Sequence, residues 1–219
     1  MKNPLKVFIM LLAVAPIALG ITGCSSGGVN GEGKKGSYDS GTPIVRGNIY
    51  NDIGWSCIEK GQYESAIKHF NDVLADSPTE SERAEANNGI GWAKAKNREE
   101  KGKLEDGIKW FLLASDLSDD AKVGLASAYL QKGSLNDLKE VIEILYVGLG
   151  KNQPRFNYVP KRATGVTNAE VHAVLAYAFA ATNDKVKSEE QLDYAKELEP
   201  NFANKSISQI LNAIEFLNN

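Results

Sequence analysis

Side chains that could catalyse a reaction are few in this chain, and their spacing matches no catalytic motif. The two histidines, His69 and His172, fall in different predicted helices. The sequence lacks the His-Glu-x-x-His, Cys-x-x-Cys and Gly-x-Ser-x-Gly spacings and a phosphate-binding glycine loop. Two acidic pairs are better explained as solvated helix ends than as an acid and a base: Glu99-Glu100 and Asp119-Asp120. We therefore expect a protein that is not an enzyme and that uses no cofactor and no metal.

One cysteine, Cys24, points to a different chemistry, the acylation of a thiol. An uncharged apolar run of 13 residues, 7–19, has the length of a signal-peptide core and is short for a bilayer span. It leads into the sequence I-T-G-C at residues 21–24, which resembles the lipobox of bacterial lipoproteins. The resemblance implies cleavage of a signal peptide of residues 1–23 and a diacylglyceryl group on Cys24. An ordinary secretory signal with a chance cysteine is the alternative.

The residues around the cleavage site also indicate where the protein resides. Ser25 and Ser26 follow the cysteine, a pattern that resembles the outer-membrane sorting signal of Gram-negative bacteria. Several acyl chains, at about 0.8 kcal/mol per buried CH₂, make a stable anchor in a lipid bilayer. We expect a lipid anchor in the bacterial cell envelope, on the outer membrane facing the periplasm if the organism is Gram-negative. Loss of Lys2 and Lys6 with the signal changes the formal charge from −3 to −5, which does not favour a nucleic-acid partner.

The segment after the cleavage site has the composition of a linker. Residues 24–46 are predicted to be the lipidated cysteine followed by a flexible tether, because this stretch holds six glycines and few large apolar groups. About 20 residues of this kind have a root-mean-square reach of roughly 25 Å. The helical domain predicted for residues 47–219 would then stand near the membrane surface without entering it.

The helices that must carry any binding site recur at intervals along the rest of the chain. Residues 47–78 have apolar positions three and four apart in two stretches, which predicts two helices joined by a turn and ended by a proline. Small residues leave room for the two helices to approach each other, and aromatic rings fill the space beside them. This unit resembles the tetratricopeptide repeat, whose intervals are matched by Gly54, Gly61, Tyr63, Ala66, Phe70 and Pro78.

Three further units follow the first. N-G-I-G-W at residues 88–92 repeats N-D-I-G-W at residues 51–55, and similar offsets recur in residues 119–150 and 167–200. Capping boxes are predicted at residues 79–82 and 167–170, and an apolar stripe in residues 206–217 is typical of a helix that caps the last repeat. We expect an all-α, right-handed α-solenoid of about four tetratricopeptide-like helix-turn-helix units with a C-terminal capping helix. Cys57 lies on an apolar stripe and is predicted to be a buried free thiol.

A binding surface follows from the family resemblance. In the tetratricopeptide family the first helices of successive units line a concave groove, and the resemblance implies that four pairs of positions point into it: Asn51 and Trp55, Asn88 and Trp92, Val123 and Ser127, and Ala173 and Tyr177. The repeated amides could bond the backbone of an extended peptide while the indoles cover its side chains. The alternative is that both tryptophans pack against neighbouring helices.

A second candidate site lies between the third and fourth units. Residues 151–166 break the helical pattern with two prolines and carry four basic residues and no acid. The segment is predicted to be either an inserted surface connection or a basic docking loop with two aromatic anchors. The candidate docking residues are Arg155, Phe156, Tyr158, Lys161 and Arg162.

The expected function is that of a non-catalytic scaffold or assembly factor, which binds protein or peptide partners of the cell envelope. The alternative is a solute- or peptide-binding accessory subunit of an envelope transporter. A deep apolar pocket would favour solute binding, and an open groove would favour protein binding. The family resemblance does not identify the partner, because one fold hosts many unrelated functions.

Overall fold

Every regular element in the described part of the chain is helical. The computed structural model describes residues 46–97, 103–200 and 205–218, and within them no strand occurs. The elements are α1 (Arg46–Glu59), α2 (Tyr63–Ala75), α3 (Glu80–Lys96), α4 (Lys103–Leu112), α5 (Asp119–Lys132), α6 (Leu135–Ile142), the π-helix η2 (Glu143–Leu149), α7 (Asn168–Ala181), α8 (Lys185–Leu198) and α9 (Lys205–Asn218). The predicted all-α class is confirmed for these residues.

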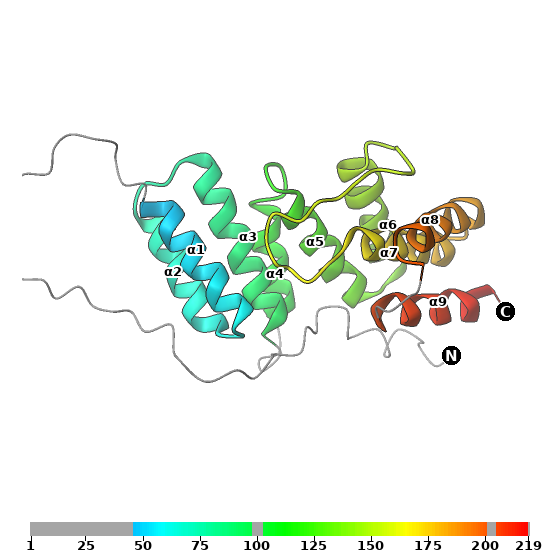
Figure 1. The fold of residues 1–219 in the computed structure, drawn as a ribbon, viewed down its shortest axis with the longest axis horizontal. Coiled ribbons are helices and arrows are strands. Elements are labelled where there is room, and N and C mark those ends of the chain that lie inside the picture. The colour runs from blue at the N-terminus through cyan, green and yellow to red at the C-terminus, as the bar shows by residue number, and fades with distance from the viewer. Residues whose placement is uncertain (1–45, 98–102, 201–204, 219) are drawn as a thin grey trace, which may run out of the picture.

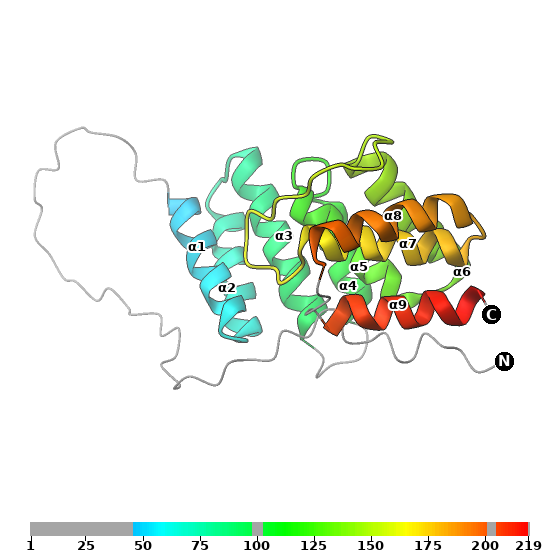
Figure 2. The same cartoon turned by 45° about the vertical axis from the view of Figure 1, so that its right-hand side comes forward.

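The helices stand in a row of consecutive pairs (Figures 1 and 2). In each pair, α1–α2, α3–α4, α5–α6 and α7–α8, the two helices pack against each other, and each pair packs against the next. The first helices also contact one another from α1 to α3 and from α3 to α5. The pairs fall where the repeated offsets predict them, so the helix positions follow from local sequence.

Capping residues and turns account for the ends of these helices. Thr79 and Thr167 each accept a hydrogen bond from the backbone three residues on, and the glutamate there bonds back, so both predicted capping boxes are present. The turns at Gly61 and Asn183 have φ of 72° and 69°, in the left-handed region that glycine and asparagine tolerate. These local signals are sufficient to position the helix pairs.

Two phenylalanines show why the first helices carry glycines. A Cβ atom at Gly54 would lie 2.6 Å from the ring of Phe70, and a Cβ at Gly89 in the next unit would overlap the same ring. Phe111 occupies the equivalent space in the following pair, against Gly91 and Gly124, where an added Cβ would lie within 2.6 Å of the ring. Each ring from a second helix is thus inserted between two first helices, which fixes their close packing.

The third pair ends differently from the expected regular helix. After α6 the chain continues as the π-helix η2, in which the N–H of Gly150 bonds to the carbonyl of Leu145 at 2.8 Å. The wider turn brings Gly150 against the ring of Phe156, 2.5 Å from where a Cβ would stand. The end of η2 is therefore shaped to receive the segment that follows it.

The last helix packs on α7, which lies in the interior of its end of the molecule. Ile210 and Ile214 of α9 are buried, Leu211 is half-buried and Leu217 is exposed. Most α7 side chains are buried as well, since α6, α8 and α9 all contact this helix. The predicted apolar stripe of residues 206–217 thus faces the protein in its middle turns.

The predicted signal peptide, Cys24 and the tether as far as residue 45 lie outside the described residues, as do Glu99 and Glu100. Arg46, predicted as the last tether residue, is the first residue of α1. Within the part of the chain that the structure describes, none of the helices has the length and apolar character needed to span a bilayer.

Candidate functional site

The repeated Asn/Trp pairs do not form an open surface. Asn51, Trp55, Asn88 and Trp92 are 1%, 3%, 0% and 0% exposed, and Tyr177 is 2% exposed. A partner cannot contact side chains that have no accessible surface, so the prediction that they line an open groove is wrong for this structure. Ser127, also buried, donates its hydroxyl to the carbonyl of Val123 at 2.8 Å within its own helix. Val123 and Ala173 are buried too.

The indoles recur because of packing between helices of one pair. Trp55 meets Phe70 edge to face at 5.8 Å between ring centroids, and Trp92 meets Phe111 in the same way at 5.6 Å. Such pairs of rings contribute about 0.5–1.5 kcal/mol beyond the area that they bury. The alternative interpretation, in which both tryptophans pack in the core, describes the structure.

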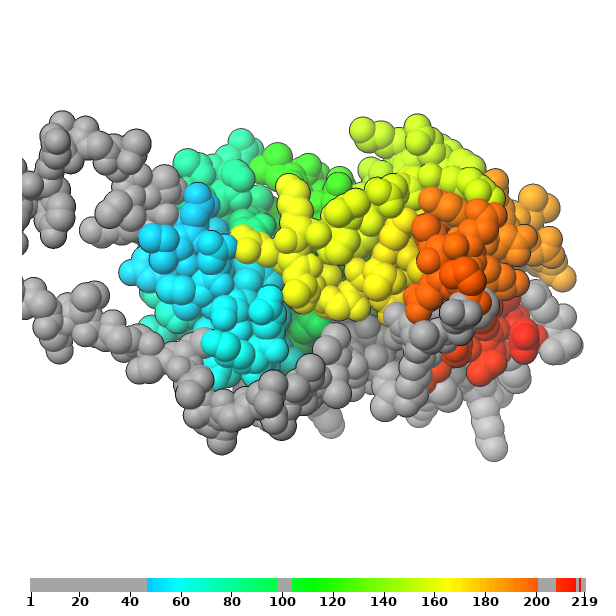
Figure 3. All heavy atoms as spheres, in the orientation of Figure 1, coloured from blue at the N-terminus to red at the C-terminus, as the bar shows by residue number. Residues whose placement is uncertain are grey.

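Residues 151–166, here called the strap, cross the face formed by the first helices. Figure 3 shows this segment, in yellow, lying over the molecule between α1 and α8. Phe156 and Tyr158 are buried while Asn157 and Val159 between and after them are exposed. This alternation is typical of an extended chain lying on a surface, where successive side chains point to opposite sides.

The strap is fixed at one end by α7 and α8. Nε2 of His172 lies 2.9 Å from the carbonyl oxygen of Phe156, and Nδ1 of the same ring lies 2.6 Å from Oε1 of Gln191. The Gln191 amide in turn donates to the carbonyl of Pro154 at 2.8 Å. Burial lowers the pKa of His172 despite these two hydrogen bonds, which favour the charged ring. A neutral ring carries one N–H and therefore donates to only one of these two oxygens.

A buried carboxylate at the start of α5 holds the middle of the strap. Asp120 accepts hydrogen bonds from the hydroxyl of Tyr158 at 2.8 Å and from the backbone N–H groups of Lys161 and Arg162 at 3.2 and 3.0 Å. Burial raises the pKa of Asp120, and these three donors act against that rise. Burial and the neighbouring Asp120 charge also raise the pKa of Tyr158. The interpretation of Asp120 as a solvated helix end is wrong, since it is 2% exposed.

Arg162 fixes the far end of the strap to α1 and α3. Its guanidinium pairs with Asp52 at 2.8 Å and with Glu85, and it lies over the Trp55 ring at 5.8 Å from the centroid. Burial pulls the pKa of Arg162 down, but its hydrogen bonds to the two carboxylates outweigh burial and leave the pKa raised. Lys96 of α3 adds a hydrogen bond to the carbonyl of Thr164 at 2.8 Å. The strap is thus faced by three carboxylates, each from the first helix of a different pair: Asp52 of α1, Glu85 of α3 and Asp120 of α5.

The candidate docking residues therefore divide into two groups. Phe156 and Tyr158 are anchors, but they are buried in this chain's own core, and the prediction that they anchor a partner is wrong for this structure. Arg155 and Lys161 are exposed, with Arg155 paired to Glu197 of α8 at 2.7 Å. The segment is neither a plain surface connection nor a free docking loop, since polar contacts to five helices hold it.

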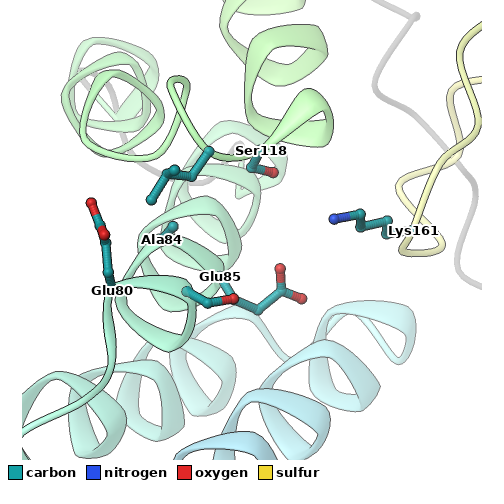
Figure 4. A pocket seen from close by; sticks show the side chains of 7 residues that line it. Glu80, Ala84, Glu85, Ser118 and Lys161 are labelled. Carbon is teal, nitrogen blue, oxygen red and sulfur yellow. The ribbon is translucent and has the colours of Figure 1, made fainter.

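A surface pocket of 210 Å³ lies beside the strap, between α3 and the start of α5. In Figure 4, Lys161 extends toward it from the strap, opposite Glu80 and Glu85 of α3 and near Ser118. Its lining is mainly polar and charged. This pocket does not provide the deep apolar cavity that solute binding requires.

Sequence reasoning missed the partners of the strap: Asp52, Glu85, Asp120, Lys96, His172 and Gln191. One signal could have pointed to the acids, because any of the four basic residues that becomes buried needs a carboxylate from elsewhere in the chain. Among the described residues, no group of three or more His, Cys, Asp or Glu is placed to hold a metal ion. Cys57 is fully buried and, within the same residues, is not in a disulfide, as predicted.

Comparisons with known proteins add no relative: no protein-family model, no curated protein and no solved structure matches the chain.

Proposed function

We propose that the protein is a non-catalytic binding scaffold or assembly factor, anchored by lipid to a bacterial envelope, which captures extended protein or peptide segments. The observation that carries this proposal is the strap. An extended polypeptide already lies across the first helices and is held by backbone hydrogen bonds, buried aromatic rings and an ion pair. A surface that holds its own chain in this way has the chemistry needed to hold another.

The fold assignment within this proposal is a tetratricopeptide-like right-handed superhelix of four units, with α9 as its cap. Support comes from the repeated N-x-I-G-W sequence and from the phenylalanines that insert between glycine-bearing first helices. The burial of Ile210 and Ile214 against α7 supports the capping role of α9. In such stacks a terminal helix with a polar outer face keeps the last repeat soluble.

The anchor within the proposal rests on residues outside the described part of the chain. The I-T-G-C sequence ending at Cys24 and the glycine-rich stretch after it support a lipidated, tethered domain. A tether of this composition lets the helical domain search the space next to the membrane, where envelope partners are concentrated.

The test is the recovery of a partner from membranes. The full chain, tagged at its C-terminus, is cross-linked in intact cells, extracted with detergent and purified, and the co-purifying proteins are identified by mass spectrometry. A matched Cys24→Ala chain keeps the helical domain but lacks the expected anchor, and it should recover less of the same envelope protein. Purification of the chain without any stoichiometric partner would contradict the proposal. Co-purification with a transporter would favour the alternative function.

A further inference from the structure

We propose that the three carboxylates beneath the strap, Asp52, Glu85 and Asp120, form a binding site for an extended basic segment of a partner protein. This segment takes the place of the strap and carries an aromatic residue four positions before an arginine, the spacing of Tyr158 and Arg162. The inference rests on the proposed function of segment capture. It adds the chemistry of the captured segment and the competitor that it must displace.

The contacts of Asp120 show which backbone shape is recognised. Two of its three hydrogen-bond donors are consecutive backbone N–H groups, those of Lys161 and Arg162, which every residue except proline can supply. The third donor is the hydroxyl of Tyr158, whose ring is buried among the helices. Asp120 therefore selects a backbone that bends at these two residues, with a tyrosine in register three positions before the first of them.

The contacts of Arg162 show which charge is selected. Its guanidinium bridges two carboxylates on different helices, Asp52 of α1 and Glu85 of α3, and lies over the indole of Trp55. Arginine suits this arrangement because its planar head donates in several directions and stacks on an aromatic ring. An acidic peptide would face three like charges here, so the site discriminates by repulsion as well as by attraction.

The ends of the strap are turns that can act as hinges. Lys151 and Asn152 have φ of 49° and 60° at one end, and Gly165 has φ of 82° at the other. The left-handed region is unfavourable for a residue with a side chain such as Lys151. The contact with α1 is also accessible, since the side chain of Asp52 is 66% exposed. Lifting the strap breaks hydrogen bonds and ion pairs and withdraws the buried rings of Phe156 and Tyr158 from the core, but it breaks no covalent bond and no helix.

The strap competes with a partner segment for the same three carboxylates, and this competition determines how tightly a free segment should bind. An attached segment has a high effective concentration, so a free segment binds only in proportion to the fraction of molecules with the strap open. Weakening the strap without altering the carboxylates should therefore strengthen the binding of a free segment.

The experiment uses the full chain in detergent and a fluorescent synthetic peptide with the sequence of residues 153–166. Fluorescence anisotropy gives the apparent Kd for the unaltered chain, for Arg162→Ala and for the control Lys139→Ala, which removes the same charge from an exposed side chain of α6 outside the strap. We expect Arg162→Ala to bind the peptide at least about tenfold more tightly than the unaltered chain, and Lys139→Ala to bind like the unaltered chain.

Two altered peptides test the proposed chemistry on the Arg162→Ala chain. A peptide with alanine at the position of Arg162 should bind about tenfold or more weakly, since it lacks the charged hydrogen bonds to Asp52 and Glu85. A scrambled peptide of the same charge should bind no better than that one. Equal binding of all three peptides would overturn the proposal.

A folded Arg162→Ala chain that does not bind the peptide would also overturn it, because the strap is then a fixed brace. If that variant does not fold, hydrogen exchange of the unaltered chain decides. Amides of Lys161 and Arg162 that exchange as slowly as those in α7 contradict displacement, and faster exchange supports it.

A dimer formed by exchanged straps in Arg162→Ala would identify a second copy as the occupant and overturn the partner class. Peptide binding without any partner in the membrane experiment leaves this inference standing while the proposed function fails.

Discussion

At the scale of residues, equivalent positions in two repeats have unequal surroundings. Asn51 donates its side-chain amide to the carbonyl of Glu82 at 3.2 Å, and only its Oδ1 is without a hydrogen-bond partner in the described part of the chain. For the buried Asn88, both side-chain amide atoms are without one in the same residues. A buried polar group without a partner destabilises a fold by about 1–3 kcal/mol. Asparagine at this position is thus expected to stabilise the first repeat and to destabilise the second.

Replacing these two asparagines by leucine, which has a similar volume, tests that difference. For Asn88→Leu we expect the free energy of unfolding to stay the same or to rise by about 1 kcal/mol, because no hydrogen bond is lost. For Asn51→Leu we expect a fall of about 1 kcal/mol, because the buried hydrogen bond to the Glu82 carbonyl is lost. Urea titration followed by circular dichroism measures both. A large loss for Asn88→Leu would mean that its amide has a structural role.

The pH dependence of stability tests the clamp of His172 on the strap. Burial lowers the pKa of this histidine in the folded protein below its value of about 6.5 in the unfolded chain. As the pH falls through 6.5, the unfolded chain takes up a proton that the folded protein excludes. The stability contributed by the neutral ring is therefore complete above about pH 6.5 and is lost at lower pH, by at most about 1.4 kcal/mol per pH unit.

The measurement is the change in the free energy of unfolding between pH 7 and pH 5. His172→Gln should reduce that change relative to the unaltered chain, because glutamine does not titrate and can still bond to the strap. An unchanged pH dependence in His172→Gln would mean that the titration of other groups dominates.

At the scale of elements, α9 is the helix whose contribution to stability can be tested most directly. It contacts α7, and its two buried isoleucines, Ile210 and Ile214, cover apolar side chains of that helix. Fully burying one isoleucine contributes about 1.5–3 kcal/mol. The helix is therefore expected to matter for stability, although much of its outer side is exposed.

Deleting α9, residues 205–218, should lower the melting temperature markedly or cause aggregation, since two isoleucines represent roughly 3–6 kcal/mol. Thermal unfolding of the truncated and full chains gives the comparison. The exposed change Leu217→Ser serves as a control, because that side chain is already 39% accessible and its loss should change little. A truncated protein that melts at the original temperature would show that α9 is a loose appendage.

At the scale of the whole molecule, the strap ties together helices that are distant in the sequence. Arg162 reaches Asp52 across 110 positions, and Lys96 reaches Thr164 across 68. Stacks of repeats otherwise contact only their neighbours, so each pair can open by itself. The strap adds contacts from α8 to α1 and couples the pairs into one unit.

The proposed membrane anchor also belongs to the scale of the whole molecule. If Cys24 is the acylated residue, Cys24→Ala should abolish lipidation, so the chain should either leave the membrane fraction or stay uncleaved, because the proposed site of acylation is gone. Fractionation and the mass of the processed chain measure this outcome. A Cys57→Ala chain is the matched control, since that thiol is buried in the helical domain and should not affect anchoring. Unchanged processing of the Cys24→Ala chain would rule out the lipoprotein signal.

The sequence by itself determined the helices and their pairing. Spacings of three and four residues, the capping boxes at Thr79 and Thr167, and the turns at Gly61 and Asn183 are local signals, and each acts within a few residues. The complementarity of Phe70 and Gly54 was also readable, because the repeat brings these positions together in any such unit.

Only the tertiary structure decided what covers the first helices. Periodicity places Trp55 and Trp92 on a helix face, but the burial of that face depends on the rest of the fold. The path of the strap depends on Asp52, Glu85 and Asp120, which are contributed by three helices far from it in sequence. Such ion pairs and backbone hydrogen bonds follow no local spacing rule, because their members are far apart in the sequence and only the tertiary fold brings them together.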